Sequence, residues 1–262
     1  MTLPWPLNHS SRLLTMKFSQ TLTLNANPDW EGQYLDYANL KKVINELFAN
    51  SQQNDHQGTK QPRDVFLEKL EGMMQSIRDF YYEKRQEMDE QMAELTHKLE
   101  RKASDTTLAT FAEDEELTPL NDDVALLGVL NPNLLSSVEL DEIRREICQL
   151  YVDYHNLQLY ATMNATAVSK ILKKYDKTMN DILKKTVLGD LLSTWFPFIT
   201  TKHSQLDLAS LETNHDAQKL DRCMTKLTRY FSKLFCQGDN ELATKRMKLL
   251  LREYVTFQRH SV

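Results

Sequence analysis

The chain has 262 residues, a net charge of −5 and 41% apolar residues, so it can bury a core and is unlike a generally basic nucleic-acid-binding protein. Only 6 Gly and 7 Pro occur, and long stretches rich in Leu, Lys, Glu, Gln and Met favour an all-α fold. No apolar stretch is long enough to span a bilayer, and the start of the chain is unlike a signal peptide. Cys148, Cys223 and Cys236 are far apart and odd in number, which predicts a reduced, cytoplasmic compartment.

The first expected elements are an extension and a helix. Residues 1–15 are expected to be a disordered extension. Asn27 is predicted to cap a helix that begins at Pro28 and runs to about Phe48. The polar residues 49–62 that follow predict a loop.

A long helix is predicted from Arg63, because apolar residues recur there in alternating steps of four and three. This seam consists of Phe66, Leu70, Met73, Ile77 and Phe80 and, after a gap, Met88, Met92, Leu95 and Leu99. Residues 104–136 include an acidic, proline-containing run and predict a loop that is partly disordered. An antiparallel partner helix is predicted over 138–160. Its apolar stripe is formed by Ile143, Ile147, Leu150, Tyr151, Tyr154 and Leu157.

The next helix, from a predicted cap at Asn164 to Lys185, has a basic face. Its lysines Lys170, Lys173, Lys174 and Lys177 fall within an arc of about 100° that contains no acid. An apolar face lies opposite and consists of Val168, Ile171, Leu172, Tyr175, Met179 and Ile182. Lysines so close repel one another, whereas an ordinary solvated face gains from interleaved acids. Flexible ammonium groups suit phosphates that point in several directions, so this face is either an anion site or simply solvated surface.

Two further helices are expected at about 216–236 and 240–258, with Gly238 ending the first of them. No strand pattern persists anywhere in the chain.

Two separated stretches carry a family resemblance. "NATAVSKILKKYDK", from Asn164, resembles the signature of the SPX domain, and "MKFSQTL" with "PDWEGQYLDYANLKK", from Met16 and Pro28, resembles its N-terminal pair of helices. The resemblance implies one SPX domain over 16–258, with its core motifs in 16–185. The stretch "LTRYFSKLFCQGDNELATKRMKLL" is similar to the end of the SPX region in phosphate exporters.

The resemblance implies a helical bundle with two long antiparallel stem helices and an N-terminal helical hairpin. It also implies a phosphate-status sensor that binds inositol hexakisphosphate or, more tightly, inositol pyrophosphates, and acts through a partner protein or a membrane phosphate transporter. The family's contact positions match a cluster of Tyr37, Lys41 and Lys173, the surface lysines Lys170, Lys174 and Lys177, and, more weakly, Lys17.

The chain departs from the family by the 15 residues before "MKF", so either Met1 or Met16 is the working start. No HExxH, GxGxxG, Walker A or GxSxG pattern occurs, so we expect no catalytic residue, metal or cofactor, and a protein that is not an enzyme. Two alternatives to a separate sensor remain open. One is the soluble N-terminal head of a phosphate transporter, at the cytosolic face of a membrane, and the other is a helical interaction scaffold without a ligand.

Overall fold

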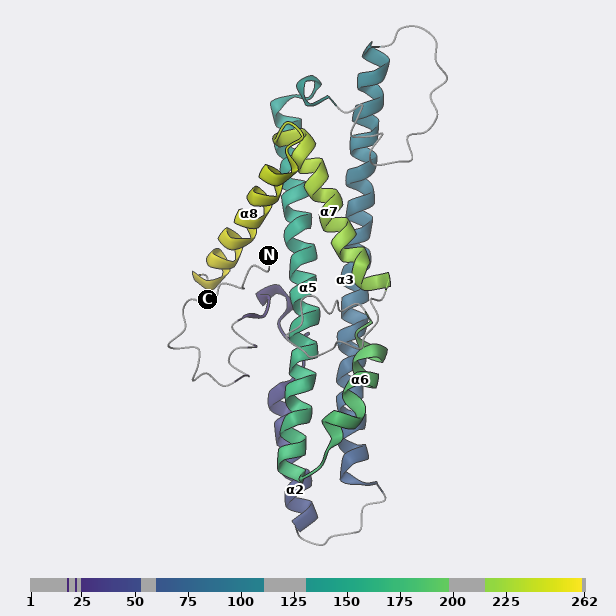
Figure 1. Cartoon of the computed structure of the whole chain (residues 1–262), viewed down its shortest axis with the longest axis vertical. Coiled ribbons are helices and arrows are strands. Elements are labelled where there is room, and N and C mark those ends of the chain that lie inside the picture. Colours follow the sequence, from purple (N-terminus) through teal and green to yellow (C-terminus); the bar gives the residue numbers. More distant parts are fainter. Residues whose placement is uncertain are drawn as a thin grey trace. The chain divides into compact units, whose positions relative to one another are not determined.

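The computed structural model describes Phe18, Leu22 and residues 25–52, 60–110, 131–197 and 215–260, and for 105–110, 215–218 and 255–260 it describes the backbone alone. These residues form six α-helices and no strand, which confirms the predicted all-α fold. The described residues make two compact units. Unit 1 comprises those up to Arg78 and Thr162–Phe196, and unit 2 comprises Asp79–Ala161 and those from Pro197 onward. The long helices α3 (Pro62–Thr110) and α5 (Ser137–Met179) contribute to both units (Figure 1).

The N-terminal helix of unit 1 begins later than predicted. Asn27 does act as a cap, but of a short 3-10 helix, η2 (Pro28–Trp30). Gly32 then adopts a φ of +82°, which interrupts the helix. Helix α2 (Tyr37–Gln52) follows after Asp36, whose carboxylate accepts the backbone N–H three residues further on at 2.8 Å.

Unit 1 is held together by an apolar core between α2, α3 and α5. The side chains with 2% exposure or less include Leu40, Ile44, Phe66, Leu70, Met74, Ile77, Val168, Ile171, Leu172 and Tyr175. The rings of Phe66 and Tyr175 stack with their centroids 4.5 Å apart, which places the start of α3 against the end of α5, so the two helices are antiparallel here. Helix α6 (Leu183–Trp195) adds Leu183, Leu191 and Leu192 to the buried set.

The buried seam of α3 differs from the predicted one by single positions. Met74 and Tyr81 are buried, whereas the predicted Met73 and Phe80 are only partly buried. The gap that the sequence shows before Met88 is filled by Arg85, which is 7% exposed. Steps of four occur more often than an alternating repeat provides, as expected for a helix with 3.6 residues per turn.

Helix α5 is a single helix of 43 residues, so the predicted break at Asn164 is wrong. No Gly or Pro interrupts it, and Asn164 lies in its interior. The helix also ends at Met179 rather than at Lys185. Ile182, which was predicted to lie on the apolar face, is therefore outside α5 and is 64% exposed.

In unit 2, α3 and α5 are again antiparallel. The Tyr154 hydroxyl donates to the carbonyl of Met88 at 3.1 Å, and Lys98 pairs with Glu146 at 2.7 Å. The predicted α5 stripe is confirmed, since all six of its members are buried: Ile143, Ile147, Leu150, Tyr151, Tyr154 and Leu157.

The two C-terminal helices were predicted to within a few residues. They are α7 (His215–Phe235) and α8 (Asn240–His260), and Gly238 between them has a φ of +86°. Helix α3 continues to Thr110, beyond the predicted loop start at 104, because no Gly or Pro stops it there. The rest of that acidic loop up to residue 130, and the extension over 1–15, lie outside the described residues.

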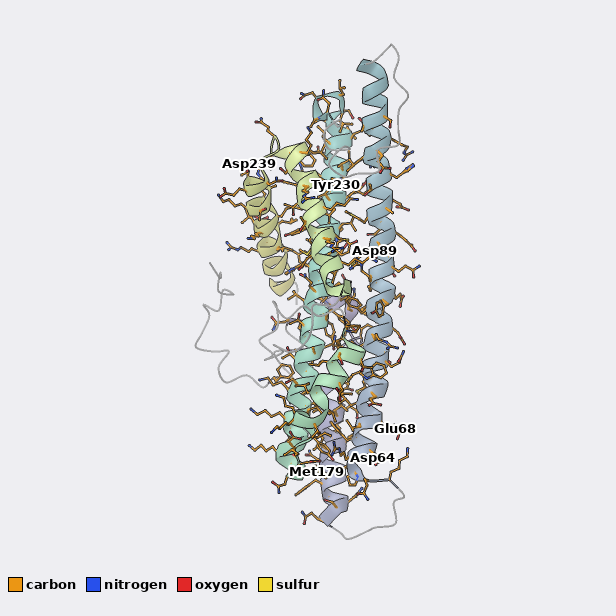
Figure 2. The ribbon with its side chains drawn as sticks, turned by 45° about the vertical axis from the view of Figure 1, so that its right-hand side comes forward. Asp64, Glu68, Asp89, Met179, Tyr230 and Asp239 are labelled. Atoms are coloured by element: carbon orange, nitrogen blue, oxygen red, sulfur yellow. The ribbon has the colours of Figure 1, made fainter. Side chains whose placement is uncertain are left out.

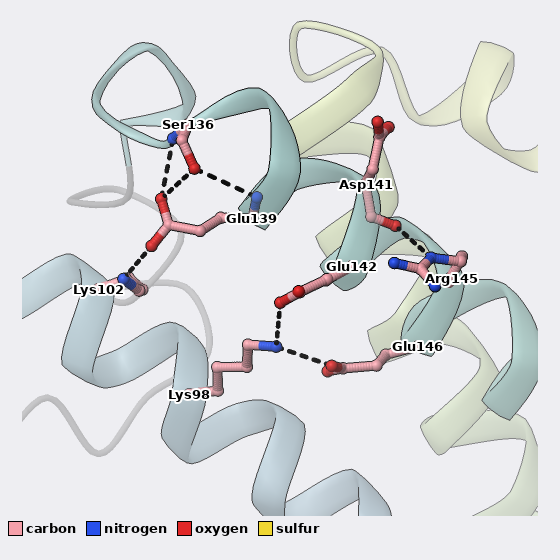
Figure 3. A network of polar contacts seen from close by, with 8 residues as sticks. All are labelled: Lys98, Lys102, Ser136, Glu139, Asp141, Glu142, Arg145 and Glu146. Atoms are coloured by element: carbon pink, nitrogen blue, oxygen red, sulfur yellow. Dashed lines mark hydrogen bonds and ion pairs between the residues drawn. The ribbon is translucent and has the colours of Figure 1, made fainter.

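The start of α5 is fixed by a capping box and by ion pairs to α3 (Figure 3). The carboxylate of Glu139 accepts from the backbone N–H of Ser136 at 2.9 Å, and the hydroxyl of Ser136 accepts from the N–H of Glu139 at 3.3 Å. The same carboxylate pairs with Lys102 of α3. The hydrogen bonds from Lys102 and Ser136 lower the pKa of Glu139 from its usual 4.5 to about 2.

This lowered pKa predicts a dependence of stability on pH. Because the folded pKa of Glu139 lies below its unfolded value, its contribution is present above about pH 4.5 and is lost as the pH falls toward 2. Urea unfolding at several pH values should show Glu139→Gln less stable than wild type at pH 7, with the difference shrinking below pH 4.5. Glu71→Gln, at an exposed position on α3, is the control. A difference that persists undiminished at pH 2 would contradict the assignment.

Candidate anion-binding site

Six of the seven predicted site residues lie in unit 1, on two helices. Tyr37 and Lys41 occupy the first two turns of α2. The four lysines of the basic arc, Lys170, Lys173, Lys174 and Lys177, occupy the last three turns of α5, which ends at Met179 (Figure 2). Lys17, the seventh, lies outside the described residues.

One buried hydrogen bond holds the start of α2 against α5. The backbone N–H of Leu35 donates to the side-chain oxygen of Asn164 at 2.8 Å, across 129 positions of sequence. Asn164 is fully buried, so losing this acceptor would leave a buried N–H group without this partner. Asn164 was predicted to be a helix cap, but it lies inside α5. The absence of a helix breaker around it was the signal that it lies inside a helix.

A second contact orients Tyr37. The ring of Phe18 meets the ring of Tyr37 edge-on, with centroids 5.2 Å apart. The "MKF" stretch and the "YLDYANLKK" stretch therefore meet at this tyrosine. Burial raises the pKa of Tyr37 above its usual 10, so its hydroxyl is neutral and able to donate a hydrogen bond at physiological pH.

The two helices run toward the same end of unit 1 (Figure 1). With a rise of about 1.5 Å per residue, Lys41 is about 6 Å along α2 from its first residue, Tyr37, and Lys170 is about 9 Å along α5 from Asn164. The hydrogen bond between Leu35 and Asn164 thus places Lys41 at a level close to the first lysine of the arc.

The two faces predicted for the lysine segment are separated in the structure. Val168, Ile171, Leu172 and Tyr175 are at most 1% exposed. On the other face, Lys170, Lys173 and Lys177 are exposed and Lys174 is partly exposed. None of these four lysines forms an ion pair with an acidic side chain among the described residues.

The nearest acids in the sequence are engaged at the end of α5. Both carboxylate oxygens of Asp176 accept from the backbone N–H of Lys184 at 3.2 Å, in the first turn of α6. The carboxylate of Asp181 accepts from the N–H of Ile182 at 2.7 Å. Lys184 therefore belongs to α6, and Asp176 connects two helices.

The end of α5 also gives one lysine a structural role. Asn180 adopts a left-handed φ of 54°, and the N–H of Asp181 donates to the carbonyl of Asp176 at 3.1 Å, as in a Schellman motif. Lys177 lies in the last turn, where a cation interacts favourably with the helix dipole. Lys170, two turns earlier, has no such benefit.

Within the described ranges no group of three or more His, Cys, Asp or Glu side chains could hold a metal ion. Among the helices that the structure describes, none is both long and apolar enough to cross a membrane.

Comparison with known proteins finds one family. The family model for the SPX domain matches residues 16–63 and 104–189, slightly more than half of the chain. An uncharacterized transporter of Schizosaccharomyces pombe is 32% identical over 120 residues, which cover 46% of this chain and 12% of the transporter. SPX domain-containing protein 3 of Oryza sativa subsp. japonica is 26% identical over 190 residues, 71% of this chain and 59% of that protein. The chain thus spans less than two thirds of either relative.

A solved structure shows the same fold. The SPX domain of Chaetomium thermophilum glycerophosphodiester phosphodiesterase 1, determined in complex with inositol hexakisphosphate, superposes with a TM-score of 0.55 at 20% identity. The match covers 84% of this chain and 99% of that domain.

The hydrogen bond of Asn164 yields a stability prediction. Asn164→Ala leaves the buried N–H of Leu35 without this acceptor, which should lower the free energy of unfolding by about 1–3 kcal/mol in urea titrations. Asn45→Ala, an exposed position on α2, is the matched control and should change it by less than about 0.5 kcal/mol. Equal effects of the two substitutions would show that the bond does not hold α2 in place.

Proposed function

Because the chain belongs to the SPX domain family, we propose that it is a non-catalytic sensor that binds an inositol polyphosphate and regulates phosphate homeostasis through a partner protein. The observation that carries the proposal is the unpaired lysine arc of α5 beside the start of α2. The inositol hexakisphosphate bound to the related fungal domain supports it. Matches to SPX domain-containing proteins of rice and Arabidopsis thaliana support a domain without an enzymatic activity of its own.

The proposed binding residues divide by position. One phosphate is bound by the cluster of Tyr37, Lys41 and Lys173. The neutral tyrosine donates a hydrogen bond at a place where another ammonium group would only add repulsion. Lys170, Lys174 and Lys177 receive the remaining phosphates along α5. Lys17, which precedes Phe18 in the sequence, is proposed as a weaker contact. Ammonium groups with three donors each adapt to a crowded ring of phosphates. Either inositol hexakisphosphate or an inositol pyrophosphate satisfies this chemistry.

A second candidate function is the head of a phosphate transporter. The match to the S. pombe transporter and a 26% identical match to the xenotropic and polytropic retrovirus receptor 1 homologue of Xenopus laevis favour it. In both cases the same domain would sense the ligand, in the cytoplasm or at the cytosolic face of a membrane. A helical interaction scaffold without a ligand is the third candidate function. Calorimetric titration with a ligand separates it from the first two, because a scaffold gives no heat of binding.

The cluster of Tyr37, Lys41 and Lys173 is tested by removing its two lysine charges. In titration calorimetry with inositol hexakisphosphate, Lys41→Ala/Lys173→Ala should weaken binding at least about tenfold, because each charged hydrogen bond contributes roughly 1.5–3 kcal/mol. Tyr37→Phe should weaken it less. Lys69→Ala/Lys185→Ala removes the same charge from exposed positions outside the cluster and is the control. An unchanged affinity of the first variant, with an intact helical circular dichroism spectrum, would place the site elsewhere.

The arc is tested by the stabilisation that a ligand provides. Lys170→Gln/Lys174→Gln/Lys177→Gln should leave the free protein within about 1 kcal/mol of wild type, since relief of repulsion offsets the lost dipole interaction of Lys177. A ligand at a hundredfold excess over Kd stabilises wild type by about 2.7 kcal/mol, seen as a higher Tm. The variant's Tm should rise much less, and high salt should reduce the wild-type shift. Equal shifts in both proteins would identify the arc as ordinary solvated surface.

A further inference from the structure

Helix α7 carries a second single-sign row of charges, in unit 2. Its members are spaced by steps of three and four residues: Lys219, Arg222, Lys226, Arg229 and Lys233. On an ideal helix they fall within an arc of about 80° and form a line roughly 21 Å long. We call this set the basic row. No acidic residue lies in the arc, and all five members are exposed or partly exposed.

Helix α3 carries a complementary set in the same unit. Asp79, Glu83, Glu87, Glu90 and Glu94 fall within an arc of about 80° and extend over roughly 22 Å. We call this set the acidic row. All five members are exposed, and no basic residue of α3 between Asp79 and Glu94 lies in the arc. The two rows therefore have the same number of charges and nearly the same length, and they differ in sign.

Both rows point away from α5. The acidic row lies roughly 120–160° around α3 from the buried seam that faces α5. On α7, the residues that contact α5 are Asp221, which accepts from Gln158 at 2.8 Å, and Phe235, whose ring lies 4.7 Å from the Arg144 guanidinium. The middle of the basic row is again roughly 120–160° from them.

Helices α3 and α7 also contact each other. Lys219 pairs with Asp89 at 3.6 Å, and Thr96 and Tyr230 share a hydroxyl hydrogen bond of 3.3 Å, in the region where Figure 2 labels Asp89 and Tyr230. The two rows therefore lie on neighbouring helices of unit 2, where a single partner can reach both.

Contacts within the chain leave part of each row without an ion pair among the described residues. Lys84 pairs with Glu87 at 2.8 Å, and Gln86 donates to Glu90 at 2.9 Å. Glu83, Glu94, Arg229 and Lys233 form no ion pair with any described side chain. Neighbouring like charges at three- and four-residue spacing destabilise a helix, so each row favours contact with a surface of the opposite sign.

We propose that the partner is a second copy of this chain, with the acidic row of each copy packed along the basic row of the other. A two-fold axis pairs the two rows twice, because each copy carries both signs on neighbouring helices. An anionic membrane or a polyphosphate would use the basic row and leave the acidic row repelled. A second copy uses both rows, and for this reason we favour it. The apolar face of α7 is already buried, with Leu220 and Leu227 at most 1% exposed, so it is not available to a membrane.

The expected dimer is weak and depends on salt, because exposed ion pairs contribute little individually and are screened. Analytical ultracentrifugation of the whole chain at low ionic strength should show the mass rising with concentration from 30.6 kDa toward twice that value. In 0.5 M NaCl the dissociation constant should increase by about tenfold or more.

Charge reversal tests the pairing of the rows. The basic-row variant is Arg222→Glu/Arg229→Glu/Lys233→Glu, and the acidic-row variant is Glu83→Lys/Glu90→Lys/Glu94→Lys. Each variant should be monomeric alone, and their equimolar mixture should form a heterodimer. The control Lys69→Glu/Lys185→Glu/Lys248→Glu makes the same charge change as the basic-row variant, at exposed positions outside both rows, and should dimerise like wild type. Circular dichroism checks that each variant is folded. If a reversal variant is unfolded, the neutral variants Arg229→Gln and Glu90→Gln should still weaken the wild-type dimer.

Three results would overturn the proposal. These are a wild-type protein that stays monomeric at low salt, reversal variants that dimerise like wild type, and a mixture that fails to associate although wild type does. A monomer that instead binds anionic vesicles or an acidic peptide would assign the basic row to another class of partner. Because neither row includes a residue of the α2–α5 site, these outcomes are independent of inositol polyphosphate binding.

Discussion

The hydrogen bond from the N–H of Leu35 to the side chain of Asn164 is the constraint on which the proposed site depends. It joins two motifs that are 129 positions apart and sets where α2 begins relative to α5. Tyr37 and Lys41 then follow within two turns on one helix, and the lysine arc follows within one and a half to four turns on the other. A polar side chain that is fully buried in a helix needs such a partner, so stability and the geometry of the site depend on the same residue.

The lysines of the α5 arc differ in how much each is expected to contribute to stability. Lys177 lies where the helix dipole favours a cation, whereas Lys170 lies where only repulsion from its neighbours is expected. Asp176 lies in the same stretch, but its carboxylate holds the first turn of α6 and leaves the arc without a paired acid. Unit 2 also carries surface charges of a single sign, in the acidic row of α3 and in the basic row of α7.

Much of this organisation was predictable from sequence, and the errors have physical causes. The apolar stripe of α5 and the C-terminal hairpin follow from periodicity and from Gly238. Periodicity does not show that Asn164 is satisfied by a backbone N–H from a distant segment, so a cap was predicted instead. It also does not show that Arg85 fills the gap in the α3 seam, where Asp89 accepts from its Nε at 2.9 Å and allows the cation to be buried. The site residues came from motif resemblance, and their joint action stays a prediction.

A crystal structure of this chain with inositol hexakisphosphate tests the proposed α2–α5 site directly. We expect the ligand between the first turns of α2 and the last turns of α5. One phosphate should lie within hydrogen-bonding distance, about 2.7–3.2 Å, of Lys41, Lys173 and the hydroxyl of Tyr37. A ligand bound instead along the basic row of α7, or contacting none of these three side chains, would contradict it.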